Sequence, residues 1–264
     1  MNKPKENKNL LKKFLALILS FGPGIFAIGF TIGTGSVTSM IVAGSTHNMQ
    51  LLWVLVLSCL FSGVLIYAYG NYSLVTGETA LFAFRKHLPL GKAMAIIIII
   101  ILTWGQWNSL SGILGISANI IYEVLSIYFP AFRGYEYEAV LVIAILIIGI
   151  MYSLLLVGKY TFFEKILVIF VSIMAISFVI SLFLVYPLPI DVVKGLIPSI
   201  PKVEGGRMLV AAFVGTTMAA ATFLSRPLFI KGKGWGMKDR RQQKNDAITS
   251  AIMLFVISGS VMAV

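Results

Sequence analysis

Two short stretches of glycine and hydroxyl side chains interrupt otherwise apolar sequence. The first covers residues 33–36 and reads Gly-Thr-Gly-Ser, and the second covers residues 215–218 and reads Gly-Thr-Thr-Met. Glycine permits unwound backbone, and hydroxyls can satisfy the amides and carbonyls that an interrupted helix leaves free. Main chain freed in this way can hold a small polar solute or an ion.

The sequence around these stretches is apolar enough to require a membrane. The chain has 264 residues, of which 58% are hydrophobic, and its mean hydropathy is +0.94. A globule of this size could not bury so much apolar side chain, whereas a membrane-spanning helix needs about 20 apolar residues. We therefore predict an all-α membrane protein with seven transmembrane helices. They cover residues 14–43, 51–69, 93–122, 139–157, 166–186, 208–230 and 247–264.

The net charge of +11 is explained by the position of the basic residues between these spans. They do not follow a helix face with interleaved aromatic side chains, so a nucleic-acid partner is excluded and contact with the lipid bilayer is expected. An N-terminus in the cytoplasm puts most lysines and arginines inside, as the positive-inside rule requires. The prediction is a multi-pass protein of the cytoplasmic membrane.

The two interruptions lie at corresponding positions of an expected internal repeat. We predict a single transmembrane transporter domain over residues 1–264, with a first five-helix repeat at about 14–186 and the start of a second at about 208–264. Secondary transporters often bind substrate between two such broken helices, here the first and the sixth. The alternative is close packing of small residues without any binding. The last span ends without a polar tail, so we expect a longer transporter.

The candidate functional residues come mainly from the two interruptions. Those predicted to bind substrate are Gly33, Thr34, Gly35, Ser36, Thr217, Met218, Ala219 and Thr222. In the third span, Gln106 and Asn108 either line a pathway or hydrogen-bond neighbouring helices.

The predicted spans hold few ionisable groups. Arg226 is the one cation inside an apolar stretch, and we expect it to reach the cytoplasmic interface, with a guarding role in the inner vestibule as the alternative. No aspartate or glutamate lies well inside a predicted span. Because no acid–base constellation can form at depth, we predict no enzymatic activity and no cofactor.

Several short motifs resemble the natural resistance-associated macrophage protein (NRAMP) family over nearly the whole chain. They are Gly22-Pro23-Gly24, Leu51-Leu52-Trp53-Val54, Leu74-Val75-Thr76-Gly77, Glu164-Lys165 and Asn245-Asp246-Ala247. The resemblance implies a LeuT-type inverted-repeat fold, of which the seven spans form part. It also implies secondary transport of divalent metals such as manganese and iron, commonly coupled to protons.

The family's metal-binding motifs are not intact in this chain. The resemblance places the family's Asp-Pro-Gly-Asn on residues 33–36, so that its carboxylate falls on Gly33 and its asparagine on Ser36. The methionine of its Met-Pro-His falls on Ala219, while a shift of one residue would place it on Met218. A manganous or ferrous ion is held by carboxylate and carbonyl oxygens with a soft sulfur, so we expect poor transition-metal affinity.

These observations predict an NRAMP-like secondary transporter of a small solute or a metal ion. Metal ion transport follows from the resemblance, and a changed substrate follows from the degenerate metal site. One alternative is a transporter of a small amino-acid-like or carboxylate solute, whose negative group would meet the N-termini of the broken half-helices. The other is a membrane scaffold without transport activity.

Overall fold

The structure of the chain is a computed structural model that describes residues 24–129, 134–156, 160–185, 187–201 and 205–264. The N-terminal part of the first predicted span, residues 14–23, lies outside this description. The described residues form helices and connecting turns, and none of them is in a strand. They divide into two compact units, one of the described residues within 24–92 and 165–264 and the other of those within 93–164.

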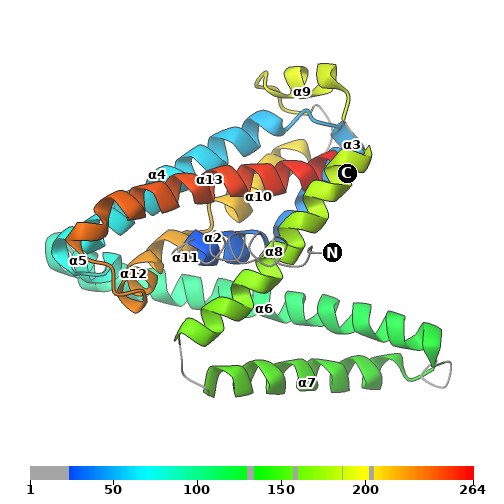
Figure 1. The fold of residues 1–264 in the computed structure, drawn as a ribbon, viewed down its shortest axis with the longest axis horizontal. Helices are drawn as coiled ribbons and strands as arrows, with labels where there is room; N and C mark the ends of the chain where they lie inside the picture. Colours follow the sequence, from blue (N-terminus) through cyan, green and yellow to red (C-terminus); the bar gives the residue numbers. More distant parts are fainter. Residues whose placement is uncertain (1–23, 130–133, 157–159, 186, 202–204) are drawn as a thin grey trace, which may run out of the picture. The chain divides into compact units, whose positions relative to one another are not determined.

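The first unit contains most of the helices, which Figure 1 shows as a packed group. In chain order they are α2 (Gly24–Thr31), α3 (Thr34–His47), α4 (Leu52–Thr76), α5 (Ala80–His87), α8 (Tyr160–Val185, from Lys165 onward), α9 (Pro189–Gly195), α10 (Gly206–Thr217), α11 (Ala220–Leu224), α12 (Arg226–Gly232), the 3₁₀ turn η2 (Met237–Asp239) and α13 (Arg240–Ala263).

Helix α13 lies at the centre of this unit. It packs against α4, α3 and α2, while α10 packs against both α3 and α4 (Figure 1). Leu254 and Ile257 on α13 and Phe213 on α10 are at most 1% exposed, so the contacts exclude lipid as well as water. The pieces of the first interrupted helix, α2 and α3, are thereby held against α13, and α10 and α11 of the second are held against α4.

Glycine allows two of these helix contacts to be unusually close. A Cβ atom on Gly44 of α3 would lie 2.0 Å from the carbonyl oxygen of Met262 on α13, and one on Gly70 of α4 would lie 1.9 Å from Nε2 of Gln243. Gln243 is fully buried and its amide donates to the carbonyls of Ile66 and Tyr67 at 3.3 and 3.4 Å. Small residues let membrane helices approach in this way.

The second unit consists of two long apolar helices. They are α6 (Gly91–Tyr128, from Ala93 onward) and α7 (Glu136–Leu156). Helix α7 has no buried residue and carries apolar side chains all round, which is typical of a helix in contact with lipid.

The membrane-protein prediction is confirmed. In the described part of the chain, six helical segments are long and apolar enough to cross a membrane: 52–76, 91–128, 136–156, 165–185, 206–224 and 237–263. They correspond to the second to seventh predicted spans, although several extend beyond the predicted limits. The described part of the first span is divided between α2 and α3, of 8 and 14 residues.

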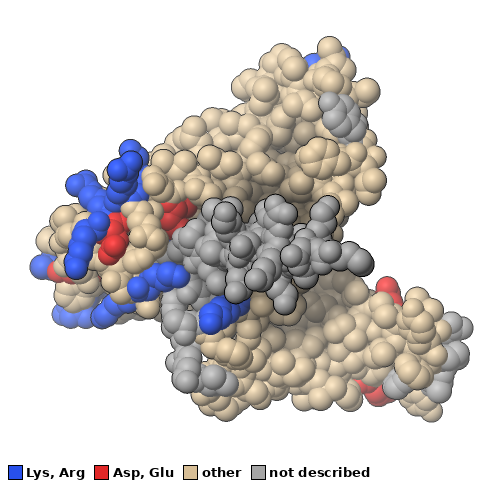
Figure 2. Space-filling model, in the orientation of Figure 1, with Lys and Arg blue, Asp and Glu red and all other residues tan. Residues whose placement is uncertain are grey.

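Two short helices were not predicted, and the charged end of the first unit lies near one of them. Helix α5 follows α4, and α9 precedes α10. In Figure 2, lysine and arginine side chains gather at one end of this unit, around α5 and the connection from α12 to α13. Glu78 accepts a hydrogen bond from Lys86 at 2.8 Å there, and that contact lowers the pKa of the Glu78 carboxyl.

The close approach of α3 to α13 gives a first test. Replacing Gly44 with alanine should destabilise the protein by about 1–3 kcal/mol, because the new methyl group would overlap the Met262 carbonyl. Thermal unfolding of the detergent-solubilised protein measures the effect. Gly259→Ala is the matched control on α13, since its Cβ would lie 3.9 Å from the nearest atom. Equal unfolding temperatures for the two variants would contradict the packing described here.

Candidate functional site

The first interruption lies at Ile32 and Gly33. Helix α2 ends at Thr31, and α3 begins at Thr34. The hydroxyl of Ser36 donates to the Thr31 carbonyl at 2.6 Å, so one of the carbonyls freed by the break is satisfied by a side chain. The predicted break is therefore present, but it lies earlier than residues 33–36, and Gly35 and Ser36 belong to the first turn of α3 rather than to unwound chain.

The second interruption lies at Met218 and Ala219, between α10 and α11. The amide of Met218 bonds back to Val214, and the hydroxyl of Ser62 on α4 donates to the Thr217 carbonyl at 2.8 Å. Here too the predicted break is present but shorter, because residues 215–217 complete α10. A further bend at Ser225 separates α11 from α12.

The two interruptions lie against each other. The Thr31 and Thr222 hydroxyl oxygens are 3.2 Å apart and buried, and they form a hydrogen bond between the two broken helices. A Cβ atom on Gly35 would lie 3.7 Å from the methyl group of Thr216. Side chains 191 positions apart in sequence are thus brought together at the places where both helices unwind.

The oxygen atoms at the interruptions are neutral. They belong to hydroxyls and to main-chain carbonyls, and the Thr217 hydroxyl is buried without a hydrogen-bond partner among the described residues. Within the described part of the chain, no group of three or more His, Cys, Asp or Glu residues could hold a metal ion. The site can therefore offer hydrogen bonds and dipoles, but no formal charge at the breaks themselves.

The backbone conformation at Gly33 does not require a glycine. Its φ of −100° and ψ of −176° are extended values that any amino acid adopts, so an aspartate at this position would not strain the chain. Gly33 is the N-cap of α3 and gives that helix no side-chain cap. The amides of the first turn of α3 therefore face the interruption without a carboxylate or hydroxyl cap.

The predicted pathway residues Gln106 and Asn108 lie in the other unit. Both are exposed on α6, and the Asn108 amide donates to the carbonyl of Trp104 at 2.8 Å. Their role in a pathway stays a prediction.

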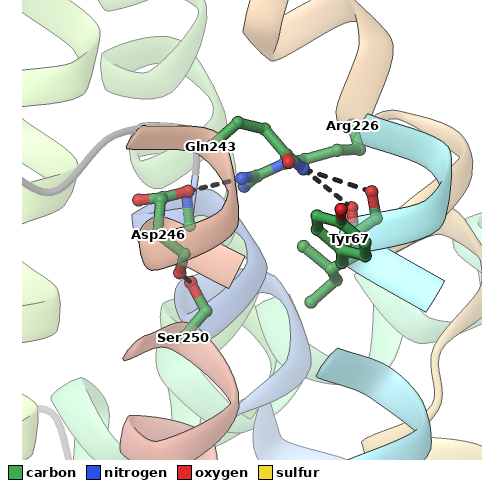
Figure 3. A network of polar contacts seen from close by, with 7 residues as sticks. Tyr67, Arg226, Gln243, Asp246 and Ser250 are labelled. Carbon is green, nitrogen blue, oxygen red and sulfur yellow. Dashed lines mark hydrogen bonds and ion pairs between the residues drawn. The ribbon is translucent and has the colours of Figure 1, made fainter. Parts of the chain in front are cut away.

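A buried ion pair lies in the same unit as the interruptions and was not predicted. Arg226 on α12 and Asp246 on α13 are 1% and 7% exposed, and the guanidinium contacts the carboxylate at 2.5 Å (Figure 3). The carboxylate also accepts a hydrogen bond from the Gly24 amide of α2 at 2.8 Å. Asp246 therefore links three helices.

Two predictions are wrong at this point. Arg226 does not extend to the interface, because its side chain is buried against Asp246. Asp246 was expected in the loop before the seventh span, but it lies in the second turn of α13, which begins at Arg240. The basic residues up to Lys244 had suggested a loop that continued to residue 246. The useful signal was the lone arginine in the sixth span, which needs an acidic partner at membrane depth.

The fold and these interruptions define a class: a polytopic membrane protein with two broken helices in contact. A family profile described as "Natural resistance-associated macrophage protein-like" matches residues 24–264. The chain belongs to the NRAMP family. No curated protein matches the chain significantly in sequence.

Solved structures show the same fold. The Eremococcus coleocola manganese transporter in complex with an aromatic bis-isothiourea compound has a TM-score of 0.68 and 17% identity, covering 100% of this chain and 53% of that one. A histidine-to-alanine mutant of that transporter has a TM-score of 0.66 and 18% identity, covering 94% of this chain and 51% of that one. A glutamate-to-glutamine mutant has a TM-score of 0.66 and 18% identity, covering 99% of this chain and 53% of that one. The chain spans about half the length of these relatives.

The ion pair provides a second test. Asp246→Ala should destabilise the protein by about 3–5 kcal/mol, because the Arg226 cation would remain buried without its carboxylate. Replacing both residues with leucine should recover most of this loss. Thermal unfolding in detergent measures both, with the exposed Glu136→Ala as the control. If the double variant is no more stable than Asp246→Ala, the pair does not act as described.

Proposed function

We propose that the chain forms part of a secondary transporter that carries a small solute or ion through a site at the two helix interruptions. The observation that carries the proposal is the contact of the two breaks through Thr31 and Thr222. Two helices that unwind at the same place expose main-chain amides and carbonyls to one site. Membership of the NRAMP family supports the same function.

Metal ion transport is the activity that the family suggests, since the structural relatives include a manganese transporter. The residues at the interruptions favour a weaker preference for transition metals. Gly33 and Ala219 provide no carboxylate or sulfur, and although the thioether of Met218 lies at the second interruption, neutral ligands compensate less of a divalent ion's lost hydration than a carboxylate would. We therefore propose that manganese binds more weakly here than at a site with a carboxylate.

A second candidate substrate is a small carboxylate or amino-acid-like solute. The first turn of α3 has no side-chain cap at Gly33, and α3 has 14 residues. Its N-terminal amides and the helix dipole would stabilise a negative group at the interruption. Thr222 and Thr217 would supply hydroxyls to the same solute.

The charged end of the first unit supports the predicted orientation. Basic side chains gather around α5 and the connection from α12 to α13 (Figure 2). We propose that this end faces the cytoplasm, in accordance with the positive-inside rule, and that the protein lies in the cytoplasmic membrane.

Substitution of Thr222 tests the site. Thr222→Val keeps the shape of the side chain but removes the hydroxyl that bonds Thr31, and uptake should fall by about threefold to tenfold if the hydroxyl stabilises substrate or the breaks. The measurement is uptake of radioactive manganese and of a panel of amino acids by the full-length protein in proteoliposomes.

Thr46→Val is the control for this experiment, because the Thr46 hydroxyl only bonds a carbonyl of its own helix. Uptake of none of these solutes by the unmodified protein would favour the scaffold without transport activity. Equal losses for Thr222→Val and Thr46→Val would contradict the proposed position of the site.

Restoring a carboxylate gives a further prediction. Gly33→Asp should tighten manganese binding by at least about tenfold, because a negative charge would then face the ion at the interruption. Gly33→Asn is the matched control of similar size without charge. Calorimetry on the purified full-length protein measures both. Tight manganese binding by the unmodified protein, or no gain from the aspartate, would show that the site lies elsewhere.

A further inference from the structure

A group of exposed basic side chains lies at one end of the first unit. We call it the basic surface, and it consists of Arg85, Lys231, Lys238, Arg240, Arg241 and Lys244. Figure 2 shows lysine and arginine gathered at this end. Segment 231–244 alone contains six basic residues and one acidic residue, so its charge is strongly positive.

The nearby acidic side chains are already engaged. Glu78 pairs with Lys86 at 2.8 Å, and Asp239 accepts a hydrogen bond from the Gly236 amide at 2.9 Å. Lys86 is therefore left out of the basic surface. Glu78 offsets Lys86 and Asp239 can offset one further positive charge, so these two carboxylates leave most of the positive charge of the basic surface uncompensated.

The basic surface lies where membrane spans end. Helix α4 ends at Thr76 and α13 begins at Arg240, and Arg240 Nε donates to Asn71 Oδ1 at 2.8 Å. Long basic side chains at the ends of spanning helices reach the depth of lipid headgroups. The side chains of this surface can therefore reach the headgroup phosphates of the lipids around the protein.

Apolar side chains are exposed beside the basic ones. Phe82 on α5 is 46% exposed, Leu90 after it is 82% exposed, and Met237 before α13 is 53% exposed. The last turn of α5 carries Arg85. Basic and apolar side chains on one short helix are typical of a segment that lies in the membrane interface.

We propose that the basic surface binds anionic phospholipids through their headgroup phosphates, while the apolar side chains beside it contact the acyl chains. Each basic residue near an anionic membrane surface strengthens binding by about fivefold. The membrane lipid is favoured over a nucleic acid because apolar side chains share the surface and because the surface lies at the ends of α4 and α13. This inference does not depend on the transported solute.

Trp235 provides a local reporter. It lies between α12 and η2, within the basic segment 231–244, and its amide bonds the Ile230 carbonyl. The experiment uses the full-length protein with the other three tryptophans replaced, as Trp53→Phe, Trp104→Phe and Trp107→Phe. Quenching of Trp235 fluorescence by brominated phosphatidylglycerol and by brominated phosphatidylcholine gives the relative association constant of the two lipids.

The expected preference for phosphatidylglycerol is about fivefold or more in this parent protein. In the triple variant Lys238→Gln, Arg241→Gln and Lys244→Gln, the ratio of the association constants for the two lipids should fall to about two or less. Lys194→Gln with Arg207→Gln, two exposed residues outside the basic surface, is the matched control and should leave the preference unchanged. In the parent, 0.5 M salt should also weaken it, since the charges are exposed.

Three results would overturn the proposal. One is a preference near one in the parent protein. Another is an equal preference in the parent and the triple variant. The third is loss of the preference on adding millimolar inorganic phosphate at constant ionic strength, which would indicate a site for a soluble phosphate compound. If the triple variant does not fold, the salt dependence of the parent decides the question.

Discussion

The structure depends on one constraint: main-chain groups freed by a broken helix must find partners where no water is available. At the first interruption Ser36 supplies a hydroxyl to the Thr31 carbonyl, and at the second Ser62 supplies one to Thr217. Because the two breaks are in contact, polar groups of one also serve as partners for the other, and Thr31 and Thr222 form a hydrogen bond. Serine and threonine suit this purpose because a short hydroxyl side chain adds no charge to bury.

Much of the fold could be predicted from hydropathy and charge. Apolar runs of sufficient length indicated the spans, and glycines beside hydroxyls indicated both breaks to within a few residues. The exact limits could not be predicted, because Gly35 and Ser36 are compatible with helix once Gly33 has taken the extended conformation. Short helices such as α5 and α9 were missed since neither has the length that hydropathy detects.

The contacts within the site were less accessible from sequence. The break positions suggested that Thr222 lies near the first interruption, but not that it bonds Thr31. The pair of Arg226 and Asp246 was missed because Arg226 was expected to reach the interface and Asp246 to lie in a loop. A charge at membrane depth is rarely stable alone, so a lone arginine in one span is itself evidence for an acidic residue in another. The resemblance to the family predicted the fold, whereas the neutral side chains at the breaks predicted weak binding of transition metals.

The first span is fastened to α13 at two points, and this has a consequence for movement. Near its start, the Gly24 amide bonds Asp246, and near its end Gly44 lies against Met262. Along α13 these anchors are 16 residues apart, or about 24 Å, whereas a continuous helix from Gly24 to Gly44 would extend about 30 Å. Regular helix at Ile32 and Gly33 would also remove the change of direction between α2 and α3. Closing the interruption would therefore change the geometry of at least one of the two attachments.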